Sequence, residues 1–196
     1  MKTMILKSLA IFAVALFLAP AVFAGNYVVD ASGSTVKWLG KKVTGEHSGA
    51  IKVKEGNLEV VDGDIKGGTI FIDMQSITND DIENEEFKQK LIGHLKSDDF
   101  FSVEANPTAK LVLTKVEKSG DNYTVTGDLT IKGITNPVTF SSTSSLVEDV
   151  LKLDGKMTID RTKYNVRYGS SSFFDNLGDK VIYDDFTLDF VLVAKK

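Results

Sequence analysis

The sequence contains no cysteine. This absence excludes disulfides, thiolate nucleophiles, thiolate metal ligands and iron–sulfur clusters. It also excludes lipid attachment at an N-terminal cysteine. A secreted protein without disulfides must be stabilised by its own core, and a closed β-barrel meets that need because it has no open sheet edges.

Histidines are scarce and basic residues do not cluster. The two histidines, His47 and His94, lie far apart in the sequence, whereas zinc usually takes three or four protein ligands, so we expect no metal site. The 27 acidic residues outnumber the 23 basic ones and give a formal net charge of −4. This acidic balance argues against a nucleic acid partner.

The first 24 residues have the pattern of a secretory signal. Lys2 and Lys7 give a positive start, residues 5–18 form a nearly unbroken apolar run, and small side chains precede a cleavage point after Ala24. We therefore expect export to the periplasm or secretion, with a mature domain of residues 25–196. Loss of the two lysines would take the formal charge from −4 to −6. No later segment is apolar enough to cross a membrane as a helix.

Most of the remaining sequence alternates between apolar and polar residues with a period of two, which is typical of strands with one buried face. The clearest runs are 123–132, 151–160 and 186–192, with shorter ones at 69–74 and 109–114. Further strands at 36–43, 49–54, 58–61 and 138–145 bring the total to about eight to ten. Turn signals at 62–64, 119–122, 133–137 and 147–149 separate these runs, so neighbouring strands should pair antiparallel.

One segment follows a helical period instead. Between residues 84 and 95 the apolar residues Phe87, Leu91 and Leu95 fall at a helical spacing, with Ile92 beside them, and Asn84 can cap the start of the helix. We expect these three apolar side chains to pack the helix onto the strands. Eight antiparallel strands can close around one small ligand, whereas two stacked sheets would fill their own core. Periodicity alone leaves both architectures open.

No motif in the sequence predicts catalysis. The serine-rich stretches lack the Gly-x-Ser-x-Gly elbow, and the acidic runs lack the spacing of a calcium loop. The apolar residues fit a packed core or an apolar ligand pocket equally well. Three hypotheses therefore stand: a binding module, an enzyme that uses histidine and carboxylate groups on a lipid or amide-like substrate, and a structural protein with a filled core.

Several blocks of the sequence resemble the YceI-like family. They occur in the order 37–40 with 44–49, then 94–107, then 127–138, then 161–166. The resemblance implies a mainly β fold, namely an extended eight-stranded antiparallel lipocalin-like barrel with one short α-helix. It also implies an exported, non-enzymatic protein that holds a long apolar chain, either a polyisoprenoid or an isoprenoid-quinone-like lipid, without a cofactor. Homodimer formation is a further expectation.

The inward faces of the expected strands would then line the ligand pocket. The lining candidates are Trp38, Ile72, Met74, Leu129, Met157, Phe186, Leu188 and Phe190. His47, His94 and Lys96 lie in the family-like blocks and are candidates for contact with a polar head group at an opening. The stretch 164–186 is expected to shape the mouth of the pocket.

Overall fold

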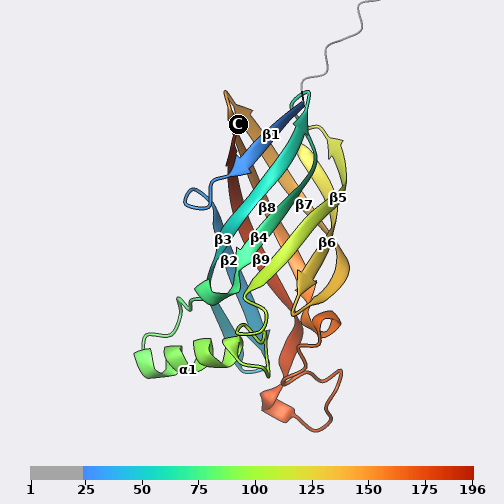
Figure 1. Cartoon of the computed structure of the whole chain (residues 1–196). Helices are drawn as coiled ribbons and strands as arrows, with labels where there is room; N and C mark the ends of the chain where they lie inside the picture. The colour runs from blue at the N-terminus through green and yellow to red at the C-terminus, as the bar shows by residue number, and fades with distance from the viewer. Residues whose placement is uncertain (1–23) are drawn as a thin grey trace, which may run out of the picture.

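Nine antiparallel strands wind into a closed barrel in the computed structural model, which describes residues 24–196 (Figure 1). The strands are β1 (Ala24–Val29), β2 (Thr35–Lys42), β3 (Gly45–Val61), β4 (Asp64–Asp73), β5 (Thr108–Ser119), β6 (Asn122–Ile131), β7 (Ile134–Val147), β8 (Val150–Asp160) and β9 (Ile182–Lys195). The helical elements are the α-helix α1 (Glu85–Lys96) and the 3-10 turns η1 (Met74–Ser76), η2 (Arg161–Tyr164) and η3 (Gly178–Lys180). The predicted signal, apart from Ala24, lies outside the described residues.

The nine strands occupy eight positions around the barrel. β2 lies between β3 and β9 along the lower part, and β1 lies between the same two strands at the upper end. In β1, Tyr27 pairs with Leu58 of β3 and Val29 pairs with Ala194 of β9. β1 and β2 are therefore two halves of one strand position, and pairing of β3 with β4 closes the ring. The predicted eight-stranded antiparallel barrel is confirmed.

Two expectations about strand boundaries are wrong. Residues 49–54 and 58–61 belong to one strand, β3, and the register shift between Val53 and Glu55 accounts for the break in the alternation. The turn predicted at 133–137 is shorter, because Lys132 and Gly133 alone make it, with φ angles of 52° and 73°. Two-residue turns with positive φ match the twist of the flanking strands, so Pro137 is free to lie inside β7 opposite Asp128.

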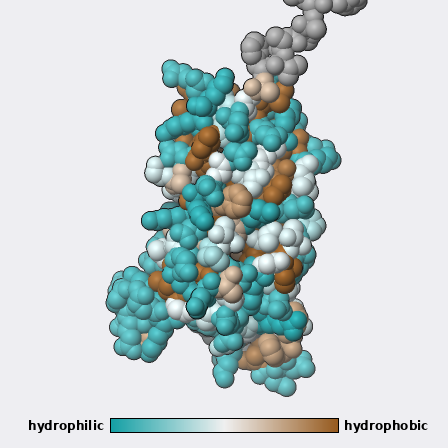
Figure 2. Space-filling model, in the orientation of Figure 1, coloured by the Kyte–Doolittle hydropathy of each residue, from teal (hydrophilic) through white to brown (hydrophobic). Residues whose placement is uncertain are grey.

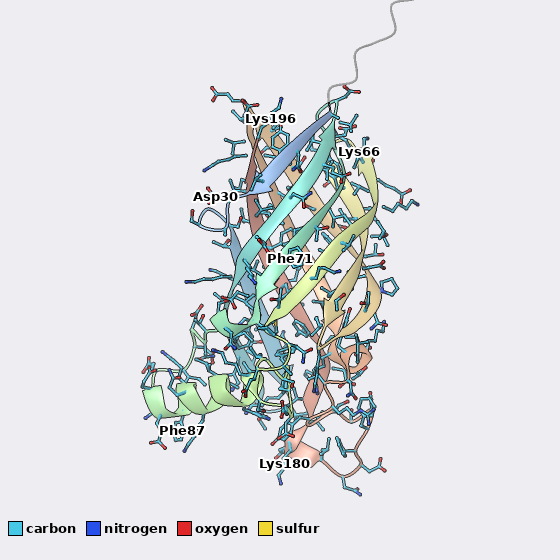
Figure 3. The ribbon with its side chains drawn as sticks, viewed as in Figure 1. Asp30, Lys66, Phe71, Phe87, Lys180 and Lys196 are labelled. Carbon is cyan, nitrogen blue, oxygen red and sulfur yellow. The ribbon has the colours of Figure 1, made fainter. Side chains whose placement is uncertain are left out.

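The predicted helix is present, but one of its expected contacts is not. The Asn84 side chain caps α1 by accepting from the Phe87 N–H at 3.1 Å. Leu95 is buried and Leu91 is half-buried, whereas Phe87 is 59% exposed. The helix points away from the barrel wall, so only its C-terminal turns reach the strands and Phe87 lies in solvent (Figures 1 and 3). The predicted packing of Phe87 on the barrel is wrong.

The two ends of the barrel differ. At the upper end β1 begins and the chain ends (Figure 1). Strand pairing places Leu58, Tyr123, Leu151 and Ala194 near this end, where they are at most 1% exposed and fill the interior. At the lower end lie α1 and the long segment 161–181 (Figure 1). Among residues 24–196, no helix has the length and apolar character needed to cross a membrane. A functional opening is therefore expected at the lower end.

Candidate ligand cavity

Two apolar cavities follow one another inside the barrel. The lower cavity has a volume of about 130 Å³ and the upper one about 80 Å³. The two cavities share four lining side chains: Val36, Ile72, Leu129 and Leu188. Because they share these walls, they form one interrupted apolar channel along the barrel axis, and the interior is not a fully filled core.

The structure places all eight predicted lining residues on this channel. Trp38, Met74 and Phe186 line the lower cavity, Met157 and Phe190 line the upper cavity, and Ile72, Leu129 and Leu188 line both. Strand parity accounts for this agreement, because alternate residues of each strand face the interior. Their contact with a ligand stays a prediction.

The size and character of the lower cavity suit an apolar guest. An engineered cavity of about 150 Å³ lined by apolar side chains stays dry and binds benzene. The lower cavity of 130 Å³ is similar in volume, and nearly all of its lining side chains are aliphatic or aromatic. Water would find few hydrogen-bond partners there, so an apolar ligand need not displace well-bound water.

The lower cavity comes close to the surface between β2 and β9. Its lining includes Gly40 of β2 and Tyr183 of β9, and the Tyr183 side chain is 50% exposed. The pairing of these strands shifts between Gly40 and Lys42, which interrupts the wall. A Cβ placed on Gly40 would find no atom within 4 Å. Open space therefore lies beside the backbone at this edge of the cavity.

Phenylalanines from the segment after α1 cover the lower end. The Phe100 and Phe101 rings stand edge to face at 5.0 Å, and Phe101 makes a similar contact with Phe186 of β9 at 6.2 Å. Lys132, in the β6–β7 turn, fastens this segment because its Nζ donates to the carbonyl oxygens of Asp98 at 2.9 Å and Phe100 at 3.0 Å. The apolar–polar alternation of the strands did not predict this cover, because Phe100 and Phe101 lie outside the strands.

Arg161 is the charged side chain that lines the lower cavity, and it is only 2% exposed. Its guanidinium donates to three backbone carbonyls, of Tyr183 at 3.1 Å, Val166 at 2.8 Å and Ile182 at 2.9 Å. The Asp184 carboxylate lies 3.4 Å away. Burial lowers the pKa of the guanidinium and the nearby aspartates oppose that effect. Arg161 therefore ties the start of the 161–181 segment to the start of β9.

Sequence reasoning overlooked Arg161 as a cavity residue, although a signal was present. Met157 and Ile159 face the barrel interior, and Arg161 continues the same odd-numbered parity. A lone arginine at an inward position is unusual because a buried charge needs partners. Only the fold shows that those partners are backbone carbonyls from a distant segment.

The three predicted head-group contacts, His47, His94 and Lys96, line neither cavity. Lys96 donates from Nζ to the Gln75 carbonyl at 2.6 Å, and the His94 ring packs edge-on to Tyr168 with centroids 4.3 Å apart. These side chains hold the elements around the mouth together. Their contact with a head group stays a prediction.

His47 lies in a hydrogen-bonded cluster with the segment that follows η1. Its Nδ1 is 2.7 Å from the Asp81 carboxylate, which also accepts from the Ser48 N–H and the Asn79 amide. Burial acts to raise the pKa of Asp81, but these hydrogen bonds outweigh it and hold the pKa below its usual value. In the described part of the chain, no three His, Asp or Glu side chains are arranged to hold a metal ion.

Tyr164, at the end of η2, gives a test of alkaline stability. It is 1% exposed and its hydroxyl has no hydrogen-bond partner among the described residues. Burial, helped by the Asp160 carboxylate, raises its pKa from 10.0 to about 12. The folded state thus holds this proton more tightly than the unfolded state, so the related stability is complete below about pH 10 and is lost as the pH rises to about 12.

We expect Tyr164→Phe to remove this part of the alkaline loss, which amounts to roughly 2 to 3 kcal/mol at about 1.4 kcal/mol per pKa unit. At neutral pH the variant should be as stable as the parent or slightly more so, because no hydrogen bond is lost. Urea unfolding between about pH 8 and pH 12 measures both effects. Tyr168→Phe, which removes a hydroxyl at an exposed position, is the control. Parallel alkaline curves for Tyr164→Phe and the parent would refute this assignment.

Comparison with known proteins agrees with the barrel fold and with the family resemblance of the sequence blocks. The YceI-like domain model matches residues 27–194. A UPF0312 protein of Shewanella denitrificans is 32% identical over 158 residues, which cover 72% of this chain and 73% of that protein. A UPF0312 protein of Photorhabdus laumondii is 53% identical over 45 residues, and this match spans only 23% of that protein's length.

Solved structures share the fold. BcnA of Burkholderia cenocepacia superposes with a TM-score of 0.69 at 25% identity, over 85% of this chain and 99% of that one. A polyisoprenoid binding domain from Saccharophagus degradans, implicated in plant cell wall breakdown, has a TM-score of 0.62 at 16% identity, over 86% and 97% of the two chains. At that identity the second likeness concerns the fold alone. The family model covers nearly all of the barrel, and this chain belongs to the YceI-like family.

Proposed function

We propose that this protein binds a long apolar ligand of the polyisoprenoid or isoprenoid-quinone class inside its barrel, and that it carries or stores that ligand in the cell envelope. The observation that carries this proposal is the apolar channel formed by the two cavities. The polyisoprenoid-binding domain of Saccharophagus degradans, which shares the fold, supports the ligand class. The signal-like N-terminus of the sequence supports the envelope location.

The shape of the channel favours an extended ligand. Ile182 lines the lower cavity and Leu192 the upper one, both on β9. At about 3.3 Å per residue, roughly 33 Å of strand separate them. Each CH₂-sized group of the ligand that leaves water contributes about 0.8 kcal/mol, so a long chain needs few polar contacts. The two cavities are small for that length, so core side chains between them must shift when the ligand binds.

The proposed role is non-enzymatic. Among the described residues, Arg161 is the charged side chain on the walls of the two cavities. Its guanidinium is already hydrogen-bonded to three backbone carbonyls and paired with Asp184. General acid–base catalysis needs a titratable group within hydrogen-bond reach of the substrate. The histidines lie outside both cavities. Binding is therefore the role that the geometry favours.

Native mass spectrometry of the protein isolated from its own exported pool, followed by organic extraction, tests this role. We expect a discrete mass increase that disappears on extraction and yields an isoprenoid lipid. A protein that is empty after isolation and also takes up no added isoprenoid alcohol or quinone would contradict the proposal and favour a structural role.

A further inference from the structure

We propose that the lower tip of the barrel docks on a phospholipid surface through a set of side chains in the 167–183 segment, which we call the tip surface. It consists of Arg167, Tyr168, Phe173, Phe174, Lys180 and Tyr183. The docking rests on the proposed function, because a cargo with negligible solubility in water must be received from a lipid phase and returned to one.

Exposed aromatic side chains are concentrated at this tip. Within residues 24–196 five aromatic side chains are exposed, and four of them are Tyr168, Phe173, Phe174 and Tyr183. The fifth, Phe87, stands apart on α1 (Figure 3). Figure 2 shows a pale brown patch at the lower tip, where the 161–181 segment projects in Figure 1. Single exposed apolar side chains scattered over a surface are normal. A cluster of exposed aromatic side chains, in contrast, marks an interaction site.

The backbone holds these rings outward. Ser170 is fully buried, and its carbonyl accepts from the N–H groups of Phe173 at 3.2 Å and Phe174 at 3.1 Å. The Ser172 hydroxyl donates to the Asp184 carboxylate at 2.6 Å, which ties the same turn to β9. The exposure of the two phenylalanines is therefore a property of an ordered turn.

Basic side chains accompany the rings. The Arg167 guanidinium lies over the Phe173 ring at 4.8 Å from its centroid. Arg167 and Lys180 also line an open depression together with Tyr168 and Phe174, and Lys132 reaches it as well. Aromatic rings beside cationic groups are the pattern of proteins that lie at the boundary between lipid head groups and acyl chains.

Acidic groups limit the electrostatic part of the docking. Asp98 and Asp99 line the same depression as the basic side chains. Each basic residue near the surface adds to the attraction to anionic lipids. These two aspartates oppose it, and so do Asp175 and Asp179, which are exposed in the same segment as the tip surface. We therefore assign most of the binding to the aromatic rings, with only a modest dependence on salt and on lipid charge.

The tip surface adjoins the mouth of the channel. Tyr183 belongs to both, because it is half exposed and also lines the lower cavity. The Gly169 carbonyl accepts from the N–H of Ile182, another lining residue, at 2.8 Å. Asp98 and Asp99 directly precede Phe100 and Phe101, which cover the lower end. Docking through the tip surface would bring this opening against the bilayer, which favours a lipid surface over a protein partner as its occupant.

Flotation of the purified mature chain with vesicles tests the proposal. The probes are vesicles of phosphatidylcholine alone and of phosphatidylcholine with phosphatidylglycerol. We expect the parent protein to float with both, and the double variant Phe173→Ser, Phe174→Ser to bind at least tenfold more weakly. Phe87→Ser is the control, since it removes a phenylalanine away from the tip that is even more exposed, at 59% against 41% for Phe173 and 50% for Phe174. Failure of the parent to float with either vesicle, or an equal loss in Phe87→Ser, would overturn the proposal.

A second measurement separates docking from ligand binding. The double variant should retain the affinity of the parent for an isoprenoid quinone supplied from detergent micelles, yet take it up from vesicles at least tenfold more slowly. Flotation of a protein that binds no isoprenoid would support docking and contradict the proposed function. A protein that loads equally fast from micelles and vesicles, without floating, would contradict docking and support the proposed function.

Discussion

Replacing Gly40 with phenylalanine is expected to weaken the binding of a long apolar ligand at least tenfold while the protein keeps its melting temperature. Gly40 lies on β2 at the wall of the lower cavity, and a Cβ built there meets no atom within 4 Å. A new phenyl ring can therefore fill the cavity without displacing the backbone. A tenfold loss corresponds to about 1.4 kcal/mol, which is the contribution of about two CH₂ groups of ligand.

The measurement is the fraction of protein that carries an added isoprenoid quinone, determined by native mass spectrometry over a range of ligand concentrations. Gly93→Phe is the control, because Gly93 also has open space around its Cβ position but lies on the exposed face of α1. It should bind as the parent does. Undiminished binding in Gly40→Phe, with a folded protein, would mean that the ligand does not occupy the lower cavity.

Arg161→Ala should cause the largest loss of stability among single substitutions around the site, roughly 3 to 5 kcal/mol in the free energy of unfolding. Removal of this side chain, which is 2% exposed, leaves three carbonyls without their donor and leaves the Asp184 carboxylate without its cation. Most of this loss comes from the carbonyls, since each buried acceptor left without a partner costs about 1 to 3 kcal/mol. Asp184 adds less, because its side chain is 24% exposed. Denaturant unfolding monitored by circular dichroism measures the change.

Two further variants make this test specific. Lys163→Ala, at an exposed position in the same η2 turn, should change stability by no more than about 0.5 kcal/mol. The stability of Arg161→Lys should lie between those of Arg161→Ala and the parent. An ammonium keeps the charge but cannot reproduce the planar guanidinium that donates to three carbonyls. Equal stability of Arg161→Ala and the parent would show that the 161–181 segment does not depend on this side chain.

The cavity residues show which parts of the site the sequence pattern could predict. Alternation along the last strand predicts that Phe186, Leu188 and Phe190 share one apolar face, and all three line the cavities. Alternation succeeds because side chains of a strand point to opposite faces in turn, whatever the partner strand is. Phe87 shows the limit, since its helical spacing was correct but the direction of the helix axis left it in solvent.

The mouth of the channel depended on contacts between distant segments. Phe100, Phe101 and Tyr183 come from two regions that meet only when β9 pairs with β2 and the segment after α1 folds over the lower end. The sequence likewise does not predict the register shift after Gly40, because that shift is a property of the pairing between β2 and β9. Such features arise from tertiary pairing, which local propensity does not encode.

The amino-acid sequence by itself determined that residues 25–196 are mainly β, that one helix lies among the strands, and which strand faces are apolar. These properties follow from local periodicity and from capping by a single side chain, so they need no knowledge of distant partners. Periodicity left closure of the strands open, and only the family resemblance implied a barrel. The tertiary structure established the ring, in which β1 and β2 share one position and β3 pairs with β4. Closure turned an apolar face into a channel, and it placed Arg161 and the exposed aromatic rings at the same end of the barrel.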